Sequence, residues 1–377
     1  MMLLKNAIRM SAVGSGKTWG ICNEALTNLS NATDHKKILM TTFTIKGIET
    51  IASYICEQNL GVLSNSIILR SWFQFLLVEL IKPYQSFIVD INTVKSFDFS
   101  DKGKKVNFGK IGEKRRYFNP DMYIMKDYAS ELAMYLIEHS NGEVVNRLEG
   151  MYSHIYIDEV QDMAGYDLKI MKALFHSSIS VVCVGDNKQA TYATHNTRTN
   201  KKYSGKKLWD FCAEVEKSNL AKIEESMVSR RFGSNICAFA NRVYPNSKNI
   251  KTGMTERTEH DGVFLIDRSD IQKYCSYFTP TILKYDKRTD VGDVISLNFG
   301  QCKGMTFDRV LIYPNKPLID FLSDVPLNNP EKYYVAVTRP RYSLVIVIDK
   351  PPKSSTFETV TINIGNAIIN GYRFVEQ

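Results

Sequence analysis

Residues 11–18, with the sequence SAVGSGKT, have the residue types and spacing of a loop that binds phosphate groups. Lys17 is expected to reach the β- and γ-phosphates of a nucleotide, and the Thr18 hydroxyl is expected to bind Mg²⁺. A glycine-rich turn with a chance Gly-Lys-Thr is the alternative, because Ser11 stands where the general pattern has its first glycine. The residues expected to turn the backbone so that N–H groups point at phosphate oxygens are Gly14, Ser15 and Gly16.

Residues 154–162, HIYIDEVQD, form a second segment suited to this chemistry. An apolar strand that ends in two carboxylates is what a Mg²⁺-dependent nucleotidase requires. Asp158 would hold the metal, and Glu159 would orient and deprotonate the attacking water. Taken alone, the segment is equally a strand that ends in a solvated acidic turn. Its place after the phosphate-binding loop favours the catalytic interpretation.

Short apolar runs rich in β-branched residues must position both segments. Runs of this kind that alternate with helical patterns are typical of buried parallel strands, so the sequence predicts an α/β fold. Residues 130–138 are expected to be helical, and the apolar stretch 7–10 precedes the phosphate-binding loop. The predicted strands are 36–44, 153–160, 178–186, 262–267, 292–299, 308–314 and 343–349.

Two regions interrupt this pattern. Residues 85–128 show no clear core rhythm and are rich in Lys and Arg, which indicates a small inserted subdomain. Residues 194–207 form a polar, basic loop. The strand-rich part of the chain after residue 225 resembles a second α/β unit.

Composition and charge restrict the class of protein. A chain of 377 residues predicts roughly two or three domains. The formal net charge of +8 is compatible with a polyanionic partner but does not establish one. The seven cysteines are scattered without a Cys-x-x-Cys pair, which favours a reducing compartment over a disulfide framework. No apolar run reaches about 18 residues, so we expect a cytoplasmic protein without a membrane span.

Taken together, the motifs of this chain resemble those of the superfamily 1 helicases of the UvrD/Rep kind. The motifs occur in that family's order, and the acidic box DEVQD matches closely through its Gln161 and Asp162. The segments that carry the resemblance are SAVGSGKT (11–18), TTFTIKG (41–47), RSWFQFLL (70–77), DEVQD (158–162), VGDNKQATY (184–192), SRRFGSNICAFAN (229–241), FGQCKGMTFDRVLI (299–312) and YYVAVTRPRYSLVIV (333–347).

The resemblance implies two RecA-like parallel-sheet motor domains that hydrolyse ATP with Mg²⁺. They would span 1–225, with 85–128 inserted, and 226–377. Gln189 would sense the γ-phosphate, Arg231 would contact it and Arg339 would be the arginine finger. Together with Lys17 and Glu159, these residues form the implied catalytic set. Two further nucleotide-binding residues are implied in the fourth and fifth motifs, namely Arg230 and Gly304.

The resemblance also implies contacts with a nucleic-acid strand, placed on aromatic and basic residues near strand ends and in the basic loop. Closing and opening of a cleft around ATP would move these surfaces relative to one another. The implied strand-contact residues are Thr42, Phe43, Lys46, Trp72, Phe73, Tyr192, Lys201, Lys202 and Tyr203.

The sequence departs from the family's pattern at several positions. The family's adenine-contacting glutamine motif lies further upstream than this sequence extends, and Arg230 stands where an aromatic residue usually stacks on adenine. Thr306 replaces a glutamate expected to contact the ribose. Thr194 stands where a base-stacking Trp is usual, so either this contact is lost or the loop 198–207 replaces it.

Spacing indicates a compact form. Only about 55 residues separate the fourth and fifth motifs, where larger relatives insert a whole domain. The segment 102–116 carries seven basic residues and one acidic residue, which suits a phosphate grip or an ordinary solvated surface.

These features favour an ATP-dependent translocase or helicase on single-stranded DNA, moving 3′ to 5′, with RNA not excluded. The alternative is a nucleotide-dependent regulatory subunit that senses DNA and controls a partner such as a nuclease, with little unwinding. A kinase-like phosphoryl-transfer enzyme leaves Gln189, Arg231 and Arg339 unexplained.

Overall fold

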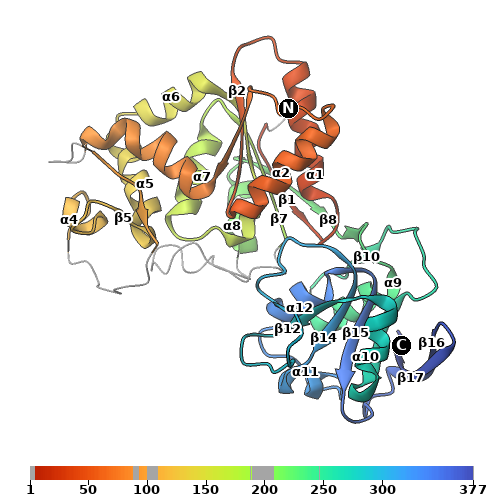
Figure 1. Cartoon of the computed structure of the whole chain (residues 1–377). Coiled ribbons are helices and arrows are strands. Elements are labelled where there is room, and N and C mark those ends of the chain that lie inside the picture. The colour runs from red at the N-terminus through yellow and green to blue at the C-terminus, as the bar shows by residue number, and fades with distance from the viewer. Residues whose placement is uncertain are drawn as a thin grey trace. The chain divides into compact units, whose positions relative to one another are not determined.

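The computed structural model describes residues 5–87, 93–99, 109–186, 188, 208–245 and 247–376. The chain forms two compact units (Figure 1). The first comprises residues 1–10 and 17–225, and the second comprises residues 11–16 and 226–377. Both are built on a mainly parallel sheet with helices on its faces, which confirms the predicted α/β class with two parallel-sheet domains.

The sheet of the first unit has six strands in the order β3-β2-β6-β7-β1-β8. The pairs β2–β3, β2–β6, β6–β7 and β1–β7 are all parallel. The strands are β1 (Ala7–Ser11), β2 (Lys37–Thr42), β3 (Ile67–Ser71), β6 (Tyr152–Ile157), β7 (Ser180–Gly185) and β8 (Lys222–Ser226).

Helices cover both faces of this sheet. Successive side chains of a strand point to opposite faces, so each strand contributes residues to two cores. On β6, Ile155 and Ile157 join the core beneath α5, α7 and α8, whereas Tyr156 joins the core beneath α1 and α2. The helices of this unit are α1 (Lys17–Ser30), α2 (Ile45–Gln58), α3 (Trp72–Phe75), the π-helical turn Leu76–Ile81, α4 (Lys114–Tyr117), α5 (Ala129–His139), α6 (Glu143–Met151), α7 (Tyr166–His176) and α8 (Leu208–Lys217).

The described part of region 85–128 packs into the core of the first unit. A short parallel pair, β4 (Phe97–Asp98) and β5 (Ile124–Met125), lies within it. Its buried side chains belong to the same cluster as α5 and α7 and are Val94, Phe97, Tyr117, Phe118 and Ile124. The apolar side chains of this region are spaced irregularly in the sequence, but those described are buried together in the core of the first unit.

The sheet of the second unit has seven strands in the order β13-β12-β14-β15-β11-β17-β16. Its first five strands are parallel, and the last two form an antiparallel hairpin. The strands are β11 (Gly262–Asp267), β12 (Thr281–Lys284), β13 (Leu297–Asn298), β14 (Phe307–Tyr313), β15 (Pro340–Ile348), β16 (Phe357–Ile364) and β17 (Ala367–Phe374). A separate parallel pair is formed by β9 (Val228–Ser229) and β10 (Lys251–Thr252).

Helices again cover both faces of this sheet. On one face, Phe239, Phe321 and Tyr334 pack from three different helices against alternate strand residues. On the other face, Tyr274 packs together with the β16–β17 hairpin. The helices are α9 (Ser234–Val243), α10 (Ile271–Phe278), α11 (Lys316–Phe321) and α12 (Glu331–Val337). No helix among the described residues is long and apolar enough to cross a membrane.

The predicted strand 292–299 is mostly wrong. Only Leu297 and Asn298 pair with a neighbouring strand, and Ile295 is 94% exposed. Gly292 has a φ of 63°, which places a left-handed turn where the sequence suggests the strand begins.

Candidate nucleotide site and strand-contact residues

The predicted catalytic segments of the first unit follow the carboxyl ends of neighbouring strands. Strand β7 lies between β1, which leads into the phosphate-binding loop, and β6, which leads into the acidic box. Because these strands are parallel, their carboxyl ends meet at one edge of the sheet, where α/β proteins commonly bind ligands. The predicted third motif, 184–192, begins at the end of β7 and so starts between the other two.

Thr18 and Asp158 form a direct contact at this edge. The Thr18 hydroxyl donates a hydrogen bond of 2.8 Å to Asp158 Oδ2, across 140 positions of sequence. Asp158 is 3% exposed. Burial, together with the neighbouring Glu159 charge, raises the pKa of the Asp158 carboxyl to about 6, while Thr18 and Lys17 oppose this shift.

This donor set fits a magnesium ion. A hydroxyl and a carboxylate supply hard oxygen atoms, and Mg²⁺ commonly uses one or two carboxylates with phosphate oxygens and water as its other ligands. Among the described residues there is no group of three or more His, Cys, Asp or Glu arranged to hold a metal. Thr18 and Asp158 would supply two oxygen ligands, and a bound nucleotide would supply phosphate oxygens.

Glu159 has an unusual backbone conformation. Its φ of 57° and ψ of 40° lie in the left-handed region, which is uncommon for a residue other than glycine. Its N–H donates to Asp158 Oδ1 at 2.8 Å, and the Gln161 side-chain amide donates to its carboxylate. Asp158 and Glu159 are thus held by different hydrogen-bond partners. Local strain at a catalytic candidate is consistent with a functional role.

Gln161 links the acidic box to the end of β7. Its Oε1 accepts a hydrogen bond of 2.9 Å from the N–H of Asp186. A Cβ at Gly185 would lie 2.5 Å from the same oxygen, so only glycine leaves room for Gln161 at this position. The family-typical Gln161 therefore positions Glu159 and the start of the third motif together.

Residues 11–16 of the phosphate-binding loop belong to the second unit. The Ala12 N–H donates to Ser226 O at 2.7 Å, and the Gly14 carbonyl accepts from the Arg230 N–H at 2.8 Å. Gly14 has a φ of 72°, and a Cβ there would lie 2.5 Å from Cβ of Arg231. Gly16 also has a positive φ, of 85°. The hydroxyl oxygen of Ser15 is buried and has no hydrogen-bond partner among the described residues.

The two predicted arginines of the second unit have different environments. Arg231 is half-buried and donates through Nη1 to the Thr338 carbonyl at 3.1 Å. Arg339 is 1% exposed, and its guanidinium donates to Val335 O at 2.7 Å and Met305 O at 3.1 Å. Arg339 therefore ties α12 and the 302–306 turn to the start of β15. The role of Arg339 as the arginine finger stays a prediction.

The other predicted nucleotide-binding residues lie in turns. Arg230 is exposed, as a side chain that stacks on a base would require. Gly304 has a φ of 80° in the turn before β14 and has open space where a Cβ would stand. These positions are compatible with the predicted roles, which stay predictions.

The segment after β2 presents polar and aromatic groups at the start of α2. Thr44 caps this helix by accepting a hydrogen bond of 3.0 Å from the Gly47 N–H, and Lys46 is exposed in the first turn. Thr42 is buried, and its hydroxyl has no partner among the described residues. The Phe43 ring lies 5.9 Å from the Phe73 ring, so these two predicted strand-contact residues are brought together.

The prediction that Trp72 contacts nucleic acid is wrong for this arrangement. Its side chain is 0% exposed, and the indole N–H donates a hydrogen bond of 2.7 Å to Asp167 Oδ1. Phe73 is largely buried at 8% exposed, against Phe97 and Phe99. An aromatic residue after a strand is ambiguous, because core and ligand positions alternate there.

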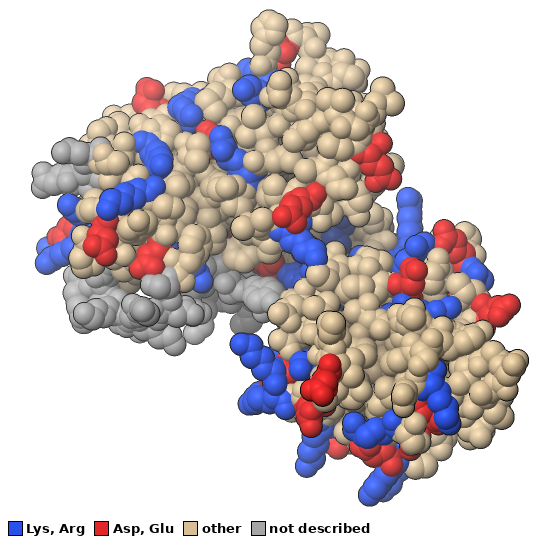
Figure 2. All heavy atoms as spheres, in the orientation of Figure 1, with Lys and Arg blue, Asp and Glu red and all other residues tan. Residues whose placement is uncertain are grey.

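Several predicted residues fall outside the described part of the chain. They are Gln189, Tyr192, Lys201, Lys202 and Tyr203, with the rest of the basic loop 198–207 and residues 102–108 of the basic segment. In the view of Figure 2, the Lys and Arg side chains of the described residues lie among Asp and Glu rather than in one patch.

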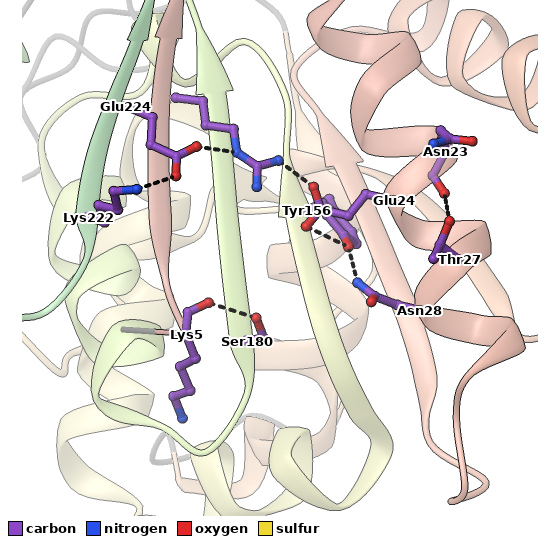
Figure 3. A network of polar contacts seen from close by, with 10 residues as sticks. Lys5, Asn23, Glu24, Thr27, Asn28, Tyr156, Ser180, Lys222 and Glu224 are labelled. Atoms are coloured by element: carbon purple, nitrogen blue, oxygen red, sulfur yellow. Dashed lines mark hydrogen bonds and ion pairs between the residues drawn. The ribbon is translucent and has the colours of Figure 1, made fainter. Parts of the chain in front are cut away.

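A polar network that the sequence did not suggest holds α1, the helix of Lys17 and Thr18, to the sheet (Figure 3). Arg9 on β1 donates to Glu24 of α1 and, at 2.9 Å, to Glu224 of β8. The Tyr156 hydroxyl accepts from Asn28 at 2.8 Å. An arginine within the otherwise apolar strand AIRMS, with Glu24 seven residues after Lys17, was the available signal.

Comparison with known proteins gives one family match. Residues 117–201 match the UvrD/REP helicase N-terminal domain. No curated protein matches the sequence. Among solved structures, the chain is similar to the helicase nonstructural protein 10 of an arterivirus, described in complex with DNA, with 15% identity and a TM-score of 0.46. The similarity covers 92% of this chain and 61% of the viral chain, so this chain spans less than two thirds of that protein's length. The matched residues 117–201 include the acidic box 158–162, so this part of the chain is similar to the UvrD/REP helicase N-terminal domain.

Proposed function

We propose that this chain hydrolyses ATP with Mg²⁺ and uses the cycle to move 3′ to 5′ along single-stranded DNA. The observation that carries the proposal is the hydrogen bond between Thr18 and the buried Asp158, with Glu159 held beside them. It brings the end of the phosphate-binding loop and the acidic box to one edge of a parallel sheet, as nucleotide hydrolysis requires. The match to the UvrD/REP helicase N-terminal domain supports the same conclusion.

The residues have distinct tasks in this proposal. Bound Mg²⁺ would neutralise charge on the β- and γ-phosphates, held through Thr18 and Asp158. Lys17 would contact the same phosphates. Glu159 would accept a proton from the water that attacks the γ-phosphorus, while the bond from that phosphorus to the β–γ bridging oxygen breaks to give ADP and phosphate. Gln161 would hold Glu159 in the required orientation.

A second function is favoured by one specific observation. Thr194 stands where relatives carry a Trp that stacks on a base, which weakens the grip expected of an unwinding enzyme. We infer as the alternative a DNA-sensing ATPase subunit that regulates a partner such as a nuclease. Both functions require turnover stimulated by nucleic acid, but only the first requires directed movement.

Displacement of streptavidin from biotinylated oligonucleotides distinguishes the two functions. A 3′-to-5′ translocase displaces streptavidin from the 5′ end in an ATP-dependent manner and leaves streptavidin at the 3′ end in place. Stimulated turnover without displacement from either end would support the regulatory subunit. Displacement from the 3′ end alone would reverse the proposed polarity, and parallel reactions on RNA establish the substrate class. The Glu159→Gln variant is the control for ATP dependence.

A further inference from the structure

Asp167, at the start of α7, is a buried carboxylate that joins three segments of the first unit. Its side chain is 0% exposed. Oδ1 accepts hydrogen bonds from the Trp72 indole N–H at 2.7 Å and from the Ser130 hydroxyl. Oδ2 accepts from the Ala164 N–H at 3.3 Å. Donors from three segments converge on this buried side chain, so moving any one of them away would leave a buried polar group unpaired, which is costly.

The hydrogen bond between Trp72 and Asp167, here called the Trp72–Asp167 arm, connects Asp167 to the candidate strand-contact residues. Trp72 begins α3, and a capping box fixes that helix: Ser71 and Gln74 bond reciprocally at 3.3 and 2.9 Å. Phe73 is the next residue, and its ring contacts the Phe43 ring before α2. Phe43 is thus connected to Trp72 through one ring contact and one peptide bond, at a helix start that is fixed by its cap.

The other arm leads to the candidate magnesium site. Two backbone hydrogen bonds follow the acidic carboxylates, from Asp162 N–H to Glu159 O at 3.0 Å and from Met163 N–H to Val160 O at 3.1 Å. The Asp167 N–H also donates to Ala164 O at 3.1 Å. Asp158 and Asp167 thus lie at the two ends of a ten-residue segment that contains two hydrogen-bonded turns.

We propose that Asp167 is a positioning residue that couples strand binding to the nucleotide site through Trp72. The inference rests on the proposed function and concerns the regulation of that same site. The indole cannot move away from Asp167 without leaving buried polar groups unpaired, which is costly, so the acidic-box segment must follow it. Such coupling is reciprocal: if the strand changes nucleotide affinity, the nucleotide changes strand affinity by the same factor.

The test uses variants that break the two arms separately. In Asp167→Asn one carboxylate oxygen becomes an N–H₂ group, so the side chain can no longer accept from both Trp72 and Ala164. Trp72→Phe keeps an aromatic ring but removes the indole donor and part of the buried volume. Ser130→Ala is the matched control, because it removes another hydrogen bond to the same Asp167 oxygen from α5, a helix with no predicted strand-contact residue.

Two quantities are measured in the full chain. The first is ATP turnover with and without saturating oligo-dT. The second is the oligo-dT dissociation constant with and without a non-hydrolysable ATP analogue, which requires no hydrolysis. We expect Asp167→Asn to keep basal turnover within about twofold and to lose about fivefold or more of the stimulation by oligo-dT. Trp72→Phe should lose the same stimulation, and the double variant should lose no more than either single variant.

The control separates coupling from simple destabilisation. Asp167→Asn and Ser130→Ala should lower the melting temperature by about 2–4 °C, because each loses a buried hydrogen bond, and Trp72→Phe should lower it further because it also leaves a cavity. Only the two variants on the Trp72–Asp167 arm should reduce stimulation and the effect of the analogue on strand affinity. Equal losses in Ser130→Ala, or unchanged coupling in Asp167→Asn, would overturn the inference.

Failure of the proposed function gives a different result. A wild-type protein without ATP turnover contradicts that function, and the strand-affinity measurement then still decides the coupling. The wild-type protein could instead hydrolyse ATP without stimulation by oligo-dT and without an effect of the analogue on the affinity for oligo-dT. That result would be compatible with the proposed ATPase activity and would overturn the coupling.

Discussion

Asp158 and Glu159 are adjacent in sequence but occupy different environments. Asp158 is buried against Thr18, and burial raises the pKa of its carboxyl. Glu159 turns away through a left-handed backbone and is held by Gln161. One residue is suited to bind a metal that compensates its burial, and the other is suited to accept a proton.

Replacement of Glu159 tests this division of roles. Glu159→Gln should bind ATP with nearly wild-type affinity but hydrolyse it about 100-fold more slowly or worse, because the amide cannot accept the water's proton. Nucleotide titration and steady-state turnover are the measurements, and Glu49→Gln, on the exposed face of α2, is the matched control. Normal turnover in Glu159→Gln would mean that another group is the base.

The two arginines of the second unit should respond differently to substitution. Arg339→Ala removes a buried guanidinium that satisfies backbone carbonyls, so it should destabilise the protein by about 2–4 kcal/mol. Arg231→Ala should leave the melting temperature nearly unchanged and lower turnover by about 100-fold or more, as loss of a γ-phosphate contact would.

Thermal unfolding and turnover of both variants distinguish the roles. A stable Arg339→Ala protein without turnover would restore Arg339 as an arginine finger. A folded Arg231→Ala protein with full turnover would remove Arg231 from the site.

The sequence predicts the residues whose roles depend on local motifs. Thr18 and Asp158, which the sequence predicts to hold the same metal ion, are hydrogen bonded to each other. Both belong to short segments whose residue types suit few other functions. The burial of Trp72 and Arg339 could not be predicted, because it depends on what α7 and α12 place around them. A motif fixes residue type but not the direction in which a side chain points.

At the scale of elements, buried parallel strands are the features that the sequence predicts best. Residues 36–44 and 262–267 contain observed strands because uninterrupted β-branched runs suit a sheet buried on both faces. The strands of the β16–β17 hairpin are not among those predicted from the sequence. Two eight-residue runs nevertheless flank Gly365 and Asn366, and a Gly-Asn pair between two strands is a recognised hairpin signal. The polar side chains that alternate along β16 interrupt the apolar run, so a pattern of continuous apolar residues does not predict this strand.

His260, at the start of β11, makes the second unit sensitive to acid. The ring stacks between Phe264 and Phe278 and contacts the Tyr274 hydroxyl at 2.9 Å. Burial, and secondly the Arg309 charge, lowers the pKa of His260 from 6.5 to about 4. Between these values the unfolded chain binds a proton that the folded chain does not. Stability is therefore unaffected above pH 6.5 and is lost as pH falls from 6.5 to about 4.

The His260→Phe variant should remove this part of the acid sensitivity. Urea unfolding of the full chain at pH 7 and pH 4.5 should show a smaller loss of unfolding free energy than in the wild type, by on the order of 2–3 kcal/mol. The comparison of differences cancels the contribution of other titrating groups. Parallel pH dependence in the two proteins would show that His260 is protonated in the folded state.

At the scale of the whole molecule, residues 11–18 are divided between the two compact units. Residues 11–16 belong with the second unit, whereas Lys17 and Thr18 begin α1 of the first. The hydrogen bonds of Ala12 and Gly14 to residues 226 and 230 account for this membership. A sequence read along the chain does not reveal it, because these contacts join segments more than 200 positions apart.

Steady-state ATP turnover tests the central claim most directly. The wild-type chain and Lys17→Ala are compared in Mg²⁺ with and without oligo-dT, and circular dichroism establishes that both are folded. The account predicts turnover that oligo-dT stimulates in the wild type and that falls to about 1% or less in Lys17→Ala. A folded Lys17→Ala protein that retains about a tenth or more of wild-type turnover would contradict the assignment of residues 11–18 as the nucleotide site.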